Sequence, residues 1–324
     1  MASFFKSLVG KFKGGADPRL YLAAFGKHPG WNDHIDDLGF ETDHLVAVKR
    51  LLYVQGIGAN IDAASWENLP EDQRLEGFNH AFLWYNPDHM ILGRFWSSRD
   101  GKGRDKYPMV VAAETTGMAL GWLVRNVFGQ LEKTEQRCLA ATTAPQVVAA
   151  VDAERAALRR LAASAPAESD TQLSPRQLLS LADNPDFAPQ REGFHRILYQ
   201  VQRGLAPYRP GGNLAACRPE HLRVPRGQQS PVDAAALYLR LLLAQLDPAT
   251  SILILIPLDQ PFLDILVGEP TPAQFFCVRA APRAVPLISD IPYTIDAPFA
   301  AAVESFITAC AAAGENPLPP FPTL

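Results

Sequence analysis

The sequence has few cysteines, and they are not spaced to act together. Cys138, Cys217, Cys277 and Cys310 lie far apart in the 324 residues, with no Cys-x-x-Cys pair among them. This spacing indicates neither a structural zinc site nor a disulfide framework. We therefore expect free thiols that are buried in the core.

Long apolar runs are absent as well. No run reaches the roughly 18 apolar residues that are needed to cross a bilayer, and no signal peptide with a cleavage site is visible. We expect a cytoplasmic protein without stable membrane insertion. The formal net charge of −4 lacks the basic excess of a dedicated nucleic-acid binder, so we expect no nucleic-acid partner.

Signatures of nucleotide binding and covalent catalysis are also missing. The Gly101-Lys102 pair has Trp96 where a Walker A loop needs its first glycine, and Gly103 where it needs Ser or Thr. No Gly-x-Ser-x-Gly elbow and no cysteine–histidine neighbourhood indicates a covalent nucleophile. We expect no cofactor. With 48% hydrophobic residues, the chain is typical of a globular protein with a sizeable core.

A strand pattern occupies the middle of the first half. Residues 77–85 and 89–96 are rich in aromatic and branched side chains and are separated by a turn at 86–88 that contains Pro87. Another apolar run at 107–113 predicts a third strand. The pattern indicates a hairpin followed by a connecting loop of residues 97–106, which we call the basic loop.

The basic loop carries the most distinctive local chemistry of the chain. Its four cations outnumber its acidic residues Asp100 and Asp105, and Gly101 and Gly103 leave the backbone N–H groups free to face an anion. One interpretation is a site for a carboxylate or a phosphorylated partner; the other is a solvated connection. The candidate binding residues are Trp96, Arg99, Lys102, Gly103, Arg104 and Tyr107.

A histidine-rich turn at 26–37 gives an alternative. Imidazoles and carboxylates are the ligands of many metal hydrolases. A metal-dependent hydrolase would use His28, Asp33, His34 and Asp36 to bind an ion and activate water. Equally, Asn32 or Asp33 could cap a helix within a surface turn.

The remaining pattern predicts a mixed α/β (α+β) fold with an amino-terminal, antiparallel-rich sheet flanked by helices and a second α/β region. We expect domains at 1–140 and 173–324, joined by an alanine-rich helix and linker at 141–172. Predicted helices cover 1–13, 41–54 (ending at Gly56 or Gly58), 118–139, 143–164, 174–184, 193–203, 230–246 and 297–313. Further predicted strands cover 20–25, 214–217, 251–258, 262–267 and 275–278.

Two motifs in the first 140 residues resemble the TagF family of type VI secretion accessory proteins. The family opens with an aromatic-Gly-Lys-x-Pro segment and later has a Val-Gly-Arg-x-Tyr/Phe-Pro segment. Phe25, Gly26, Lys27, Pro29 and Asp33 fit the first motif, and Gly103, Arg104, Tyr107 and Pro108 fit the second with one extra residue before the tyrosine. His28, Asn32 and His34 depart from the family pattern.

The resemblance implies a non-enzymatic regulatory or adaptor protein of a bacterial type VI secretion system. Such a protein would control assembly after translation by binding other secretion-system proteins, with a forkhead-associated-domain scaffold as a candidate partner. It also adds Lys27 and Asp33 to the expected binding residues.

Overall fold

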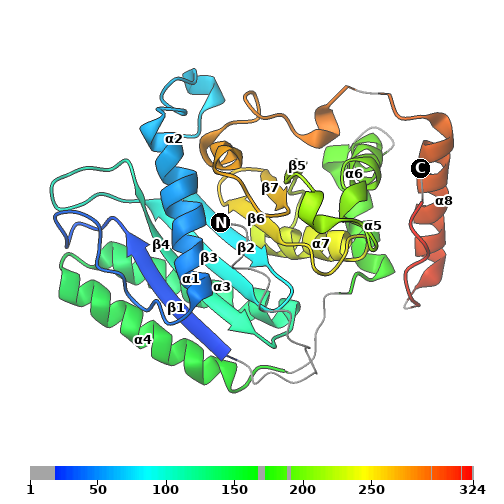
Figure 1. Cartoon of the computed structure of the whole chain (residues 1–324). Helices are drawn as coiled ribbons and strands as arrows, with labels where there is room; N and C mark the ends of the chain where they lie inside the picture. The colour runs from blue at the N-terminus through cyan, green and yellow to red at the C-terminus, as the bar shows by residue number, and fades with distance from the viewer. Residues whose placement is uncertain (1–18, 167–171, 188–190, 293, 315, 323–324) are drawn as a thin grey trace.

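The computed structural model describes residues 19–166, 172–187, 191–292, 294–314 and 316–322. These residues form a mixed α+β fold around one antiparallel sheet of seven strands, in the order β1-β4-β3-β2-β6-β7-β5 (Figure 1). The helix expected at 1–13 and residues 167–171 of the expected helix-and-linker region lie outside the described residues.

The first four strands follow the predicted pattern. β1 is Arg19–Gly26, β2 is Asn79–Tyr85, β3 is Met90–Ser97 and β4 is Pro108–Thr116. The hairpin of β2 and β3 is confirmed, and the basic loop connects β3 to β4, because Ser97 lies opposite Pro108. The loop therefore leaves the sheet at the end where β1 finishes beside β4, with Gly26 opposite Met109.

The second half adds three strands to the same sheet. β5 is Glu220–Pro225, β6 is Ile252–Pro257 and β7 is Phe262–Val267. β6 pairs with β2 over the register from His80↔Pro257 to Tyr85↔Ile252. The two expected regions thus share one continuous sheet instead of each having its own.

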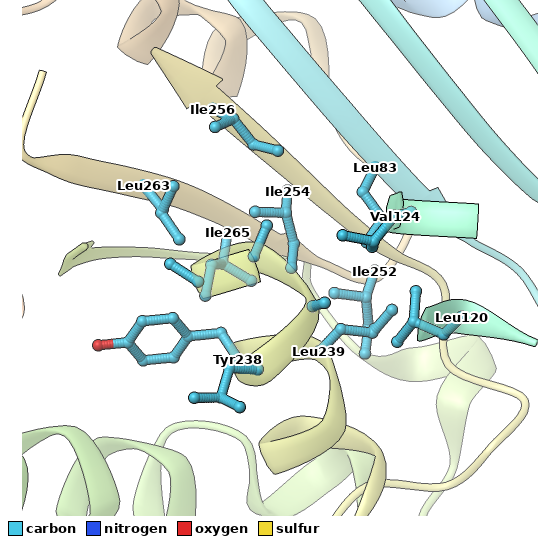
Figure 2. Packing of buried hydrophobic residues seen from close by; sticks show 14 of the residues in the cluster. Leu83, Leu120, Val124, Tyr238, Leu239, Ile252, Ile254, Ile256, Leu263 and Ile265 are labelled. Carbon is cyan, nitrogen blue, oxygen red and sulfur yellow. The ribbon is translucent and has the colours of Figure 1, made fainter. Parts of the chain in front are cut away.

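One face of the sheet is covered by the long helices. These are α3 (Leu120–Ala140), α4 (Ala144–Ala162) and α7 (Pro231–Leu243); α5 (Pro175–Ala182), α6 (Glu192–Arg203) and α8 (Ala297–Ala313) pack beyond them, against α7 and against one another. Figure 2 shows Leu120 and Val124 of α3 and Leu239 of α7 around Ile252 of β6. Residues from both halves therefore form one continuous hydrophobic core on this face of the sheet.

The opposite face carries a separate aromatic core beneath a helical segment. α1 (Asp43–Val48) continues as the π-helix η2 (Lys49–Gly58) and as α2 (Ala59–Asp62) (Figure 1). The predicted end at Gly56 or Gly58 is wrong. A Cβ on Gly56 would lie 2.6 Å from the Phe275 ring, so this glycine allows close packing and does not end the helix.

Two predicted strands are also wrong. Residues 214–217 contain the short 3-10 helix η6 (Leu214–Ala216), and 275–278 lie in the 3-10 helix η7 (Pro272–Arg279). A short apolar run buries its side chains in either conformation, so its composition does not separate the two. Edge strand β5 was not predicted, because its His221 and Arg223 are polar.

The four cysteines are free, and all are buried except the partly exposed Cys217. None of the helices in the described ranges combines the length and the apolar character that a membrane span requires.

Candidate functional site

The two short motifs that flank β1 and β4 meet in space. Where β1 ends, the Lys27 N–H donates to the carbonyl of Pro108 at 3.1 Å. Gly26 makes this approach with φ +111°, and a Cβ there would lie 2.3 Å from the Pro108 oxygen. Only glycine fits such a contact without strain. The histidine-rich turn is therefore held next to the point where the basic loop enters β4.

Asp100 lies at the centre of this contact. Its carboxylate accepts hydrogen bonds from Lys27 Nζ at 2.8 Å and from Arg104 Nε at 2.7 Å. It also accepts from the backbone N–H groups of Lys102 and Arg104, at 2.9 and 3.0 Å. Lys27 and Asp100 are both buried. Burial raises the pKa of the Asp100 carboxyl, but the Lys27 and Arg104 bonds outweigh it and hold that pKa well below its usual range.

This arrangement corrects the expected role of the loop glycines. The N–H groups of Lys102 and Arg104 point inward to the Asp100 carboxylate, and the N–H of Gly103 donates to the Asp100 carbonyl at 2.9 Å. The prediction that these N–H groups face an outside anion is wrong, because Asp100 occupies that position itself. The Asp100-Gly101 pair was the signal for it, since Asp favours such turns.

Arg104 links the basic loop to the histidine-rich turn. Its Nη2 donates to the Asn32 carbonyl at 2.9 Å and lies 3.1 Å from Asp33 Oδ1, which also contacts Lys27 Nζ at 2.9 Å. The hydrogen bond from Lys27 is the main reason why the pKa of Asp33 falls to about 2. Lys27, Asp33, Asp100 and Arg104 form what we call the ion-pair network, with two cations and two carboxylates.

The outer surface of the basic loop keeps other cations. Arg99 and Lys102 are exposed, and within the described ranges neither side chain has an ion-pair or hydrogen-bond partner. Lys106 lies 3.8 Å from Glu67. Trp96, which we expected to contact a partner, is instead buried in the core under the long helices.

Three aromatic rings line the side of the site next to the turn. His34, Tyr53 and Tyr107 lie with their ring centroids 5.4 to 5.8 Å apart. Tyr53 is buried, and its hydroxyl makes no hydrogen bond to any described residue. Burial also raises the pKa of this hydroxyl far above its usual value. Nothing in the local sequence distinguishes Tyr53 from an ordinary core residue.

The candidate metal ligands in the turn have other partners. The buried His28 donates from Nε2 to the Cys138 carbonyl at 2.9 Å and accepts at Nδ1 from the Gly30 N–H at 3.0 Å. Asp36 accepts from Trp31 Nε1 at 3.2 Å. His28 is thus fully used in fixing the turn.

The structure does not gather His28, Asp33, His34 and Asp36 at one point. Among the residues described, the groups whose potential ligand atoms lie within 4.8 Å of one another are two others, His44 with Asp88 and His89, and His221 with Asp264 and Cys277. The following helix is capped by Thr42, which accepts from the Leu45 N–H at 3.3 Å, and not by Asn32 or Asp33.

No protein-family model matches the chain, and the comparison with curated proteins gives no match.

Proposed function

We propose that this protein is a non-enzymatic binding module that presents the basic loop to an acidic or phosphorylated protein partner. The observation that carries the proposal is the division of charge in the loop. Arg104 is neutralised within the ion-pair network, whereas Arg99 and Lys102 remain exposed and unpaired in the part of the chain that is described.

The network also gives the loop a fixed shape. Asp100 binds two backbone N–H groups of the loop while Lys27 holds the carboxylate from below. A loop that is ordered before binding loses less conformational entropy when a partner docks. The guanidinium of Arg99 can then donate two parallel hydrogen bonds to a carboxylate or phosphate, and Lys102 adds a point charge.

The resemblance to the TagF family extends the proposal to the partner. The residues that carry the resemblance, Lys27 and Gly26 in one motif and Arg104 and Pro108 in the other, contribute to the same site. On this basis the protein is a regulator or adaptor of a bacterial type VI secretion system. It would act after translation, with a phosphorylation-controlled forkhead-associated-domain scaffold as the candidate partner.

Affinity purification from the native cell tests this function. The tagged wild-type protein is compared with Arg99→Glu/Lys102→Glu, which reverses the two unpaired charges. Arg125→Glu/Arg160→Glu is the matched control, because it reverses two exposed arginines on α3 and α4 and makes the same change in net charge.

We expect secretion-system proteins with the wild type and the control, and their loss with the loop variant. Phosphatase treatment of the lysate separates a phosphate from a carboxylate as the recognised group. Equal capture by the loop variant would contradict the proposal.

A further inference from the structure

A second polar cluster lies at the other end of the sheet from the basic loop. Its residues come from three places: His44 in the first turn of α1, Glu114 in β4, and Asp88 and His89 in the turn between β2 and β3. The turn reaches Glu114 because Met90, at the start of β3, lies opposite Thr115 of β4. None of these residues belongs to the ion-pair network.

The two imidazoles are each held by a different carboxylate. His44 Nδ1 lies 2.9 Å from Glu114 Oε1, and His89 Nδ1 lies 2.6 Å from Asp88 Oδ1. The rings stack face to face, with centroids 3.7 Å apart. One potential ligand atom from each of His44, Asp88 and His89 lies within 4.8 Å of the others.

One ring nitrogen of the pair is free to bind a cation, and a second is engaged only by a neutral amide. With Nδ1–H donating to Asp88, His89 keeps a lone pair on Nε2, which accepts from the Asn86 amide at 3.2 Å. When Nδ1–H of His44 donates to Glu114, its Nε2 carries a lone pair at a side chain that is 43% exposed. The Glu114 carboxylate behind the His44 imidazole is the arrangement that orients a histidine and makes it more basic in a metal site, whereas Asp88 can be a ligand only when it gives up its contact with His89 Nδ1.

The charge of the cluster favours a cation. The Glu114 carboxylate is buried, and among the described residues its ion-pair partner is His44 alone, just as that of Asp88 is His89 alone. No lysine or arginine in the described ranges neutralises either group. A buried carboxylate without a permanent countercharge is costly unless a proton or a metal ion supplies one.

We propose that His44, His89 and Asp88 bind a divalent transition-metal ion of the zinc class, with Glu114 as the residue that positions His44. Two imidazoles with one carboxylate suit zinc and its neighbours, whereas calcium and magnesium prefer oxygen ligands alone. A ring-nitrogen lone pair lies in the plane of its ring, and the planes of these two rings are nearly parallel. Both lone pairs can therefore point at one ion only after one of the rings turns.

The second group of potential ligands is less suited to a metal. Both oxygens of Asp264 accept from Arg223, at 2.8 Å each, and His221 Nε2 lies 2.7 Å from Oδ1. A cation at Asp264 would therefore lie beside a buried guanidinium. His221 consequently serves as the control histidine.

The test is zinc titration of the full chain, purified with a tag that lacks histidine and stripped with a chelator. Calorimetry in excess magnesium gives the affinity, and elemental analysis gives the stoichiometry. We expect one zinc per chain in the wild type, loss of binding in His44→Gln and in His89→Gln, and unchanged binding in His221→Gln. Glu114→Gln removes only the positioning contact and should weaken zinc binding by about 10- to 100-fold.

Ring-nitrogen NMR of the wild type makes the result independent of how the variants fold. Zinc should shift the ring nitrogens of His44 and His89 and leave those of His221 in place. No zinc binding by the wild type would overturn the proposal and leave a proton as the cation of the cluster. Binding that survives His44→Gln, or that His221→Gln removes, would overturn it too.

Discussion

The ammonium of Lys27 lies 2.8 Å from the Asp100 carboxylate although 73 positions separate them in the chain. Both side chains are buried, and Arg104 and Asp33 add a second ion-pair contact to each of them. Through this pair the end of β1 determines the shape of the basic loop, and a loop of fixed shape is what the proposed binding function uses.

Lys27→Met should loosen the basic loop. The change removes the cation under Asp100 and leaves a buried carboxylate with less compensation, which destabilises the folded state. We expect a clear fall in melting temperature and faster amide exchange at Lys102 and Arg104, whose N–H groups depend on Asp100. Unchanged exchange at these two positions would show that the loop keeps its shape without Lys27.

Arg104→Glu should cost more stability than an ordinary surface change. Arg104 contacts Asp100, Asp33 and the Asn32 carbonyl, so a glutamate there would repel two carboxylates. We expect a loss above about 0.5 kcal/mol, the usual limit for surface substitutions. The variant Arg99→Glu/Lys102→Glu should stay within that limit. Equal denaturant midpoints for the two variants would count against a structural role for Arg104.

The pH dependence of stability should include Asp33. Its pKa lies at about 2 in the folded protein, below the ordinary value of 3.8, so its contribution is present above pH 3.8 and is lost as the pH falls toward 2. Asp33→Asn should therefore reduce the slope of melting temperature against pH in that interval. The slope that remains reflects groups such as Asp100, whose pKa is lowered too. An identical slope in the variant would contradict this assignment.

Arg223→Met should destabilise the second half strongly. The guanidinium is buried and donates to both oxygens of Asp264 and to the carbonyls of Cys277, Ala280 and Val285. Removing it leaves the buried Asp264 carboxylate without this ion-pair partner, which lowers the free energy of unfolding by about 3–5 kcal/mol. The double variant Arg223→Met/Asp264→Leu should recover part of the loss. No recovery in urea unfolding would mean that the carbonyl contacts dominate.

Tyr53→Phe should keep the stability or raise it by about 1 kcal/mol, because the buried hydroxyl makes no hydrogen bond to the described residues. Thermal and urea unfolding measure the change. A loss greater than about 1 kcal/mol would show that the hydroxyl is hydrogen-bonded in solution.

Elements defined by neighbouring residues could be predicted from the sequence. The β2–β3 hairpin follows from alternating apolar residues around a turn, and α5 begins at Pro175 because Ser174 caps it through its own side chain. Helix α8 spans the predicted residues 297–313 for a similar reason, since Asp296 accepts from the Phe299 N–H.

Features that depend on partners far away in the sequence could not be predicted from it. Pairing of β2 with β6 joins residues 167 to 177 positions apart, from Tyr85↔Ile252 to His80↔Pro257, and no local pattern records it. Burial of Arg223 in an edge strand depends on Asp264 in β7. For the site, the charges of the basic loop were visible in the sequence, but which of them are neutralised depends on Lys27 and Asp33, from a different part of the chain.

The central claim is that the outer face of the basic loop contacts a partner, and a photo-crosslinking residue tests it most directly. It is placed in the native cell at Asp105, which is exposed in the loop, and in parallel at Arg160 on α4. The account predicts a cross-linked partner from position 105 alone, with an acidic or phosphorylated peptide at the cross-link. Identical cross-links from both positions, or none from position 105, would contradict it.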